Sequence, residues 1–253
     1  MDSEGSRADA VDDGVANSLR GRLVELRQYT LVPGQRDALI EVFDAYFVEG
    51  QQAVGIDVVG QFRDLDDPDR FVWLRGYESM TARGEALPAF YYGPVWRAHR
   101  ARANATMIDS DNALLLAPLA LGAEYPRPET KPADAAAKSI VAITVAHLAQ
   151  PLADADRQLA EAAATELAAA GAGVVAVLAT HVAENNFPAL PLREEHVLVW
   201  VTRFRSDADY ARHRDLLTTS SGWREVRRRL AARGNGTPMQ GLRLRPTRRS
   251  RLR

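Results

Sequence analysis

The sequence contains no cysteine, and only two of its basic residues are lysine, Lys131 and Lys138. Without thiols the chain can form no disulfide, carry no thiolate nucleophile and bind no cysteine-ligated metal or iron–sulfur cluster. Nearly all of the positive charge is therefore arginine. Together with the many alanines, this usage is typical of a GC-rich bacterial gene.

Long apolar runs and an excess of one charge are also missing. Lys and Arg number 32 and Asp and Glu 33, so no field of one sign favours nucleic acid or a membrane surface. No apolar run reaches the about 20 residues of a membrane-spanning helix, and residues 1–21 lack the basic and apolar regions of a signal peptide. We therefore expect a cytoplasmic protein with neither nucleic-acid nor membrane partners.

Hydrophobic periodicity and turn residues predict the same order of elements twice, namely strand, helix, strand, strand, helix and strand. In the first half the expected elements are strands 23–32, 57–65, 70–77 and 112–119, helices 35–54 and 91–104, and a short helix capped by Ser79. In the second half they are strands 139–148, 173–182, 196–204 and 238–246, and helices 152–170, 207–217 and 221–232.

Aromatic residues support a tandem repeat. Trp73, Tyr77 and Trp96 recur as Trp200, Phe204 and Trp223, each displaced by 127 positions. The predicted fold class is α+β, with two ferredoxin-like (βαββαβ) repeats that close an intramolecular dimeric α+β barrel. The chain is then a monomer with an internal pseudo-dimer, or a homodimer.

The predicted boundaries follow from composition. Residues 1–21 are polar and are expected to be a disordered leader, and residues 121–138 contain three prolines and are expected to be a linker. The two repeats then span residues 22–120 and 139–246. The basic segment 247–253 is expected to be a solvated tail.

Strand alternation places polar and aromatic side chains of the first repeat on one face. We expect this face to look toward the second sheet, opposite small residues, and to leave room for a small-molecule ligand inside the barrel. On it lie Glu25, Arg27, Tyr29, Trp73, Arg75 and Tyr77, facing Ala142, Thr144 and Ala146. The alternate residues Val24, Leu26, Val72 and Leu74 would then face the helices.

Three segments of the first repeat carry a family resemblance. They are "VELRQYTLVPGQRDALIEVFDAYF", "GQFRDLDDPDRFVWLRGYESM" and "YYGPVWRAHRARANATMIDSDN", and together they resemble the NIPSNAP family over residues 22–117. The resemblance implies the dimeric α+β barrel fold. The wider superfamily includes cofactor-independent monooxygenases, polyketide cyclases, haem-degrading enzymes and ligand binders.

The second repeat departs from this pattern. It lacks the Pro-Gly turn, and Val226, Thr202 and Gly236 occupy the positions of His99, Arg75 and Asp109. We therefore expect any chemistry to belong to the first repeat.

Candidate catalytic residues are His99, Tyr29 and Arg75. His99 titrates near neutrality and is the natural general base or acid, and Tyr29 is a second candidate proton carrier. Arg75 and Arg27 are expected to hold an anionic substrate. The alternatives are a partly exposed helix histidine, and arginines neutralised by Glu25 and Asp64 in a structural network.

Further substrate contacts are predicted from the aromatic residues Trp73, Tyr77, Tyr92 and Trp96. Such side chains stack on planar molecules, although they also form ordinary cores. No metal site is predicted, because Asp109 and Asp111 lack the rest of a calcium loop. His147 and His181 are expected on strands that are not adjacent, which disfavours a joint metal or haem site.

The leading functional hypothesis is a cofactor-independent biosynthetic enzyme of secondary metabolism, a monooxygenase or a cyclase, that acts on an aromatic or polyketide-like substrate. No cofactor is expected. The alternatives are a non-catalytic binding or oligomeric assembly protein and, less favoured, a haem-binding or haem-degrading protein.

Overall fold

The computed structural model describes residue 19 and residues 23–119 and 138–253. Its first half contains strands β1 (Leu23–Leu31), β2 (Asp57–Asp64), β3 (Arg70–Tyr77) and β4 (Met107–Pro118) and helices α2 (Arg36–Val42), η1 (Phe43–Phe47), α3 (Val48–Gln52), α4 (Met80–Tyr91) and α5 (Pro94–Asn104). Its second half contains strands β5 (Ile140–Leu148), β6 (Gly173–Thr180), β7 (His196–Phe204) and β8 (Gln240–Pro246) and helices α7 (Asp154–Ala169), α8 (Asp207–Thr219) and α9 (Ser221–Arg233).

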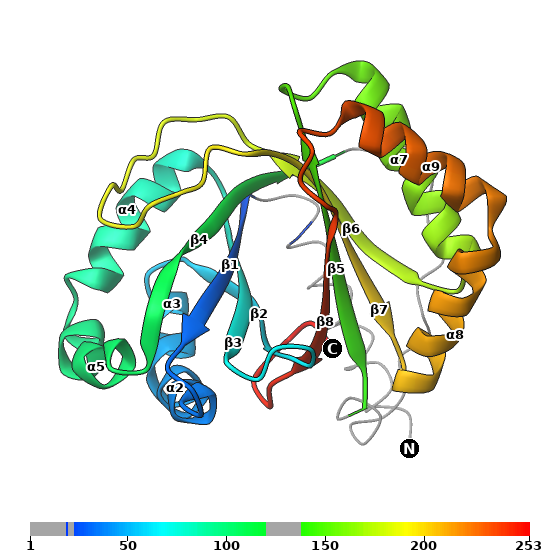
Figure 1. The fold of residues 1–253 in the computed structure, drawn as a ribbon. Coiled ribbons are helices and arrows are strands. Elements are labelled where there is room, and N and C mark those ends of the chain that lie inside the picture. The colour runs from blue at the N-terminus through cyan, green and yellow to red at the C-terminus, as the bar shows by residue number, and fades with distance from the viewer. Residues whose placement is uncertain (1–18, 20–22, 120–137) are drawn as a thin grey trace, which may run out of the picture.

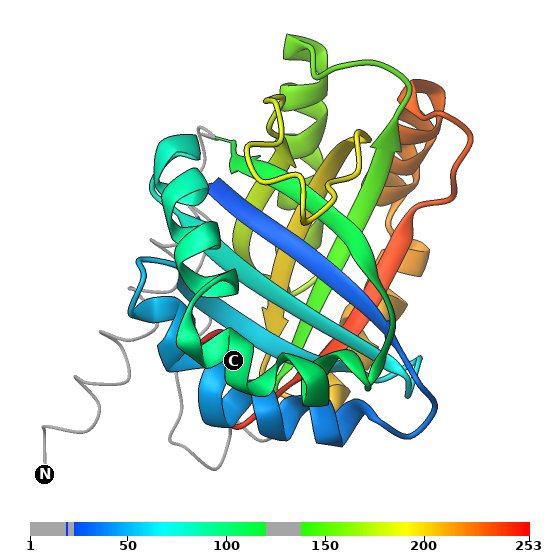
Figure 2. The same ribbon diagram turned by 90° about the vertical axis from the view of Figure 1, so that its left-hand side faces the viewer.

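The eight strands form a closed antiparallel barrel in the order β1-β3-β2-β8-β5-β7-β6-β4. The first half contributes β4-β1-β3-β2 and the second half β8-β5-β7-β6, so the strand order within each half is the same. Short pairings of β2 with β8 and of β4 with β6 join the two halves. The helices of each half pack on the outside of its own strands (Figures 1 and 2).

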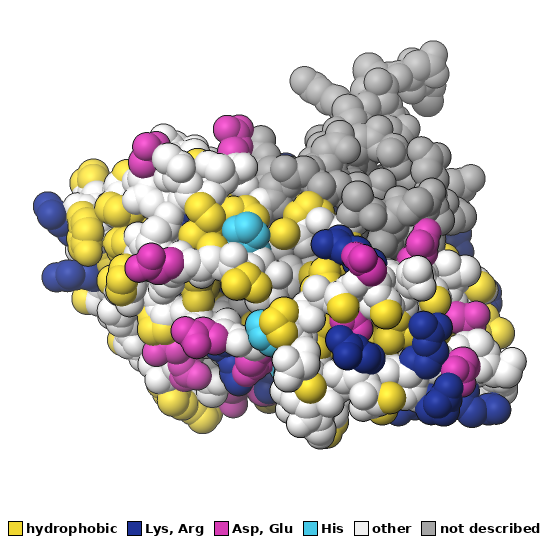
Figure 3. Space-filling view, turned by 90° about the horizontal axis from the view of Figure 1, so that it is seen from above, with side chains coloured by type: hydrophobic (Ala, Val, Ile, Leu, Met, Phe, Trp, Pro, Cys, Tyr) yellow, Lys and Arg dark blue, Asp and Glu magenta, His cyan; other side chains and the backbone are white. Residues whose placement is uncertain are grey.

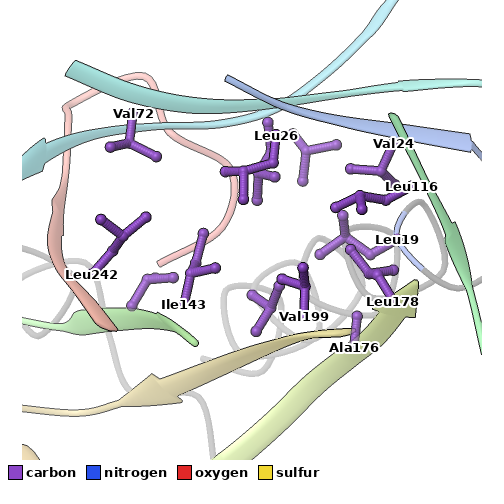
Figure 4. Close-up of a cluster of buried hydrophobic side chains, with 14 of the residues drawn as sticks. Leu19, Val24, Leu26, Val72, Leu116, Ile143, Ala176, Leu178, Val199 and Leu242 are labelled. Atoms are coloured by element: carbon purple, nitrogen blue, oxygen red, sulfur yellow. The ribbon is translucent and has the colours of Figure 1, made fainter. Parts of the chain in front are cut away.

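The barrel interior is lined mainly by apolar side chains. Val24 and Leu26 of β1 pack there against Ile143 of β5 and Val199 of β7 (Figure 4). The expectation that these β1 residues face the helices is therefore wrong, and with it the expectation of a polar ligand cavity inside the barrel. Alternation identifies which side chains share a face but not which partner that face meets, because the period of two is the same for either orientation.

The opposite face of the first half packs on its helices. Tyr29, Trp73 and Tyr77 pack with Phe43 of η1 and Phe90 of α4 in one cluster. In the second half Ala142 and Ala146 likewise pack on helical residues and not on the first sheet. The predicted polar face therefore exists, but it lies between sheet and helices.

Residues 247–253 are not a solvated tail. The side chain of Leu252 is 1% exposed and packs in the barrel interior. The backbone amide of Thr247 donates to Gln61 and that of Leu252 donates to Val59, so this segment follows β2. The leader was predicted for residues 1–21, of which only the buried Leu19 is described, and the predicted linker lies outside the described residues except for Lys138.

The strand predicted for residues 112–119 begins earlier in the structure. It is β4, which starts at Met107, includes Asp109 and Asp111, and pairs with β1 through two register shifts. By contrast, the bounds predicted for 70–77 and 196–204 are confirmed by β3 and β7. Within the described ranges, the helices are too short or too polar to cross a membrane.

Candidate functional site

A buried cluster of charged side chains lies between the sheet and the helices of the first half. It consists of Glu25 and Arg27 on β1, Arg75 on β3 and Arg83 on α4, and all four side chains are 0% exposed. Arg75 directly faces Glu25 across the β1–β3 ladder. Arg83 reaches them from α4, whose start is fixed by Ser79, which caps the helix by accepting a hydrogen bond from the amide of Ala82.

Glu25 is the shared partner of the three arginines. Its Oε2 accepts hydrogen bonds from Arg75 Nε at 2.8 Å and from Arg27 Nη1 at 3.1 Å, and Arg75 Nη2 lies 2.7 Å away. Its Oε1 accepts from Arg83 Nε at 2.7 Å. One carboxylate thus fixes three guanidinium groups that come from three different elements.

The remaining donors of Arg27 and Arg75 have neutral partners. Arg27 donates to the hydroxyl of Tyr29 at 3.3 Å and to the carbonyl of Ser110 at 3.0 Å. Arg75 Nη1 donates to Gln51 Oε1 at 3.2 Å and to the hydroxyl of Tyr91 at 3.3 Å. Neutral acceptors orient the guanidinium groups but do not compensate their charge.

Gln51 reaches the cluster from a helix that contains a π-turn. The helical segment from α2 to α3 includes η1, where the backbone amide of Val48 donates to the carbonyl of Phe43. Phe43 and Phe47, four residues apart on one face of this segment, both bury their rings in the cluster between helices and sheet. Single π-turns inside α-helices occur often at functional sites.

The cluster carries more positive than negative charge. Three arginines face one carboxylate without exposure to water. Burial alone would raise the pKa of Glu25, but Arg75, Arg27 and Arg83 together hold it well below its usual range. Glu25 therefore stays ionised, and the cluster keeps a net charge of about +2. Since an uncompensated buried ion costs several kcal/mol, this arrangement favours an additional anion.

Apart from Arg75 Nη2, which makes no hydrogen bond but lies 2.7 Å from Glu25 Oε2, three buried polar atoms at this cluster have no hydrogen-bond partner among the described residues: Arg83 Nη2, the hydroxyl of Tyr77 and Trp73 Nε1. Buried polar groups are nearly always paired, so such atoms indicate a missing water or ligand. Burial raises the pKa of Tyr77 well above its ordinary value, which keeps its hydroxyl protonated. All three groups are therefore hydrogen-bond donors, as an anion requires.

Aromatic rings surround the guanidinium of Arg75. Its Cζ lies 4.9 Å from the ring centre of Trp73, 5.7 Å from that of Tyr77 and 5.9 Å from that of Tyr91. Cation–π contacts of this kind hold an arginine in place without neutralising it. The site thus combines planar apolar surfaces with a positive centre.

The second half contributes the cover of this site. Residues 181–195, between β6 and β7, form a strap that passes over α4 (Figures 1 and 2). Arg83 Nη1 donates to Asn185 Oδ1 at 3.0 Å and to Asn186 Oδ1 at 2.6 Å. The ring of Phe187 stacks on Tyr91 with centroids 5.8 Å apart. Seen from above, the described surface carries acidic, basic and hydrophobic side chains interspersed (Figure 3).

The structure brings together five of the eight predicted site residues, namely Arg27, Tyr29, Trp73, Arg75 and Tyr77. Trp96 packs at the edge of the same cluster against Tyr91, with centroids 4.8 Å apart. Tyr92 is 59% exposed and contacts Phe187 edge to face.

His99 lies elsewhere. Its ring stacks on Tyr46 of η1 at 3.6 Å, and Tyr46 is 40% exposed. The two rings therefore lie on the outer side of the helical layer, and the structure gives His99 no contact with the arginine cluster. The predicted site residues thus divide into a buried group and an outer pair.

Sequence reasoning missed Arg83 and the strap asparagines. Arg83 had a usable signal, since Ala86, Leu87 and Phe90 follow at helical spacings of three, four and seven and are buried. A basic residue on a buried helical stripe implies a buried partner. Asn185 and Asn186 have no such signal, because they lie in an irregular segment of the other half.

Metal-binding groups of three or more His, Asp or Glu side chains are absent from the residues that the structure describes. His147 Nδ1 lies 3.2 Å from Glu195 Oε2, and no contact joins it to His181. His147 lies on β5 and His181 directly follows β6, and these two strands are not neighbours in the barrel.

The fold and the cluster together define an α+β barrel protein with a buried arginine site. Residues 24–121 match the sequence profile of the NIPSNAP family, and this segment is a NIPSNAP domain. Comparison with curated protein sequences finds no matching relative.

Solved structures share the fold over nearly the whole chain. A protein named anthrone oxidase-like has a TM-score of 0.62 and 14% identity, covering 91% of this chain and 93% of its own. A protein from Fusobacterium nucleatum subsp. nucleatum, provisionally named a monooxygenase, has a TM-score of 0.57 and 10% identity, covering 90% and 93%. Another from Lactobacillus acidophilus, also provisionally named a monooxygenase, has a TM-score of 0.51 and 10% identity, covering 90% and 94%.

Proposed function

We propose that the first half binds a small organic anion between its sheet and its helices. The observation that carries this proposal is the set of three fully buried arginines that share the single carboxylate of Glu25. A purely structural network would be expected to balance its charges, since unpaired buried ions are costly. A bound anion would supply the missing negative charge.

The surrounding groups favour a planar, oxygen-bearing anion. The unpartnered donors of Arg83, Tyr77 and Trp73 suit oxygen atoms of a carboxylate, phenolate or enolate. The rings of Trp73 and Tyr91 offer apolar faces for an aromatic molecule. The ligand class is therefore an aromatic or polyketide-like anion. Its proposed binding site lies between the sheet and the helices of the first half and not in the barrel interior.

The reaction we propose is a cofactor-independent oxygenation or cyclisation. The arginines would stabilise the enolate or phenolate of the substrate, which is the electron-rich species in both reactions. In an oxygenation, a CH₂ group and O₂ become a carbonyl group and water. The neighbouring structures named anthrone oxidase-like and, provisionally, monooxygenase support this direction at the level of fold.

Tyr29 is the proton carrier that the geometry favours. Its hydroxyl contacts Arg27 Nε at 3.3 Å, and burial raises its pKa, so it is protonated at neutral pH. Glu25 is too weak a base for this role, because the arginines hold its pKa low. His99 stays a candidate only if the substrate extends to the outer side of α5.

A non-catalytic binding protein is the second candidate. The complete burial of the arginines and the strap across α4 favour tight retention of a ligand over rapid exchange. In this case the anion would be a permanent component of the fold. Activity on candidate substrates, measured as oxygen uptake or product formation, separates the two functions.

The two halves are further inferred to be tandem ferredoxin-like repeats, with the boundaries 22–120 and 139–246. Their common element order and strand order support this inference. The aromatic matches at an offset of 127 positions add to it.

The test is a comparison of Tyr77→Phe with the wild type by native mass spectrometry and thermal unfolding. The hydroxyl of Tyr77 has no hydrogen-bond partner among the residues that the structure describes, so its removal should leave the melting temperature unchanged or raise it. If it contacts the ligand, retention of a small anion should fall by about 5- to 10-fold, the effect of one hydrogen bond.

Tyr46→Phe is the matched control, because Tyr46 lies outside the cluster and should change neither property. A lower melting temperature for Tyr77→Phe together with no retained small molecule in the wild type would contradict the proposal. His99→Ala, tested in the same assays, shows whether the outer histidine takes part.

A further inference from the structure

The second half contains a cavity of about 350 Å³ that is separate from the arginine cluster. It lies between the C-terminal end of α7, the end of β7 and the first turns of α8. Its lining comprises Ala169, Ala170, Gly171, Arg203, Phe204, Arg205, Asp209, Arg212, His213 and Leu216. Its size is at the lower end of the range for small-molecule sites.

The cavity lies beside the helix of the second half that corresponds to α4 of the first half. Tyr77 is the last residue of β3 and Phe204 the last residue of β7. Each is followed by a helix that packs back on its own half, α4 in one case and α8 in the other. At the offset of 127 positions the counterpart of Arg83 is Tyr210, which packs against the core of the second half and does not line the cavity.

The rim of the cavity is positively charged. Arg205 Nε lies 3.0 Å from Asp209 Oδ2, which neutralises one charge. Arg203 donates to the carbonyl of Arg253 at 3.2 Å, and Arg212 is exposed at the rim. The cationic group that faces an incoming anion is therefore Arg212, whose side chain is exposed to solvent at the rim of the cavity.

The interior of the cavity adds an acceptor and an apolar wall. His213 Nδ1 lies 3.1 Å from the carbonyl oxygen of Ala170. A carbonyl can only accept, so Nδ1 carries the proton and Nε2 keeps a lone pair. Burial lowers the pKa of His213, which keeps the ring neutral. Phe204 and Leu216 supply the apolar surface.

We infer that this cavity binds a small aromatic carboxylate that carries a hydroxyl group. Arg212 pairs with the carboxylate, Phe204 and Leu216 contact the ring, and His213 Nε2 accepts a hydrogen bond from the hydroxyl. The inference does not depend on the anion site of the first half, since the two sites share no residue.

The experiment is a titration of the full-length ¹⁵N-labelled protein with 4-hydroxybenzoate, benzoate and inorganic phosphate, followed by NMR. Shift changes are expected at the end of β7 and along α8, with 4-hydroxybenzoate binding more tightly than benzoate and phosphate more weakly than both. Arg212→Ala should weaken binding of 4-hydroxybenzoate by about tenfold, since it removes a charge-assisted contact.

Two further variants make the outcome decisive. Arg227→Ala removes an exposed arginine of α9 outside the cavity and should bind as the wild type does. His213→Phe should bind benzoate and 4-hydroxybenzoate equally. Equal affinities of Arg212→Ala and Arg227→Ala, or shift changes confined to the first half, would overturn the inference.

Discussion

Glu25 is the carboxylate on which Arg27, Arg75 and Arg83 converge, and its loss should be severe. Glu25→Gln removes the negative charge and leaves three buried cations without it. Breaking a buried ion pair in this way costs about 3–5 kcal/mol of unfolding free energy. Chemical denaturation at pH 7 measures this loss. Glu41→Gln is the control, because Glu41 forms an exposed ion pair with Arg102 and its replacement should cost less than about 1 kcal/mol.

Glu25 also makes the unfolding free energy depend on pH, and the direction of this dependence follows from its pKa. The pKa of Glu25 in the folded protein lies well below its usual value of 4.5. Its contribution to stability is therefore complete above pH 4.5 and is lost as the pH falls toward the folded pKa. The stability difference between the wild type and Glu25→Gln should shrink by about 1.4 kcal/mol per pH unit below 4.5. A difference that is constant from pH 5 to pH 3 would contradict this assignment.

At the level of single residues, the sequence predicted which side chains belong together but not where they lie. Arg27, Tyr29, Trp73 and Arg75 share one face because alternation requires it, and this is what the structure shows. The side of the sheet that meets the helices is decided by the packing of whole layers. Local alternation contains no information about it.

The strap is the structural element that joins the two halves at the site. Asn186 accepts from Arg83 and donates to the carbonyl of Met80, so it fixes the strap to α4 at two points. Asn186→Ala removes both bonds, and we expect faster amide hydrogen exchange across residues 181–195 with a loss of about 1–3 kcal/mol in global stability.

Glu184→Ala is the control for this experiment, since Glu184 is exposed on the same strap. A bound anion should slow exchange of the strap in the wild type by stabilising Arg83. If Asn186→Ala exchanges as the wild type does, the strap is held by its other contacts, such as that of Phe187 with Tyr91.

Elements with regular periodicity were predictable, whereas the strap was not. The bounds of β3 and β7 follow from their apolar runs and turn residues. Residues 181–195 show no hydrophobic periodicity, because individual side chains of this segment make its contacts with the first half of the chain. The position of the C-terminal segment 247–253 could not be predicted for a similar reason. Its arginines predicted an exposed tail, whereas the buried side chain of Leu252 holds the segment against the barrel.

On the scale of the whole molecule, the barrel depends on its C-terminal residues. Leu252 fills the interior together with side chains from both halves. Leu252→Ala should lower the unfolding free energy by about 2–4 kcal/mol, the cost of a cavity in a packed core. Chemical denaturation measures this, with Arg248→Ala, an exposed position in the same segment, as the control. Equal stability of both variants would show that the segment does not support the barrel.

The joining of both sheets in a single polypeptide has a genetic consequence. In a barrel of the same strand order made from two identical chains, every mutation would appear twice, at symmetry-related positions. Here β2 pairs with β8 and β4 with β6 inside one chain, so each mutation appears once. Natural selection can therefore act on the two halves separately, preserving the arginines of one while reshaping the loop of the other that covers them.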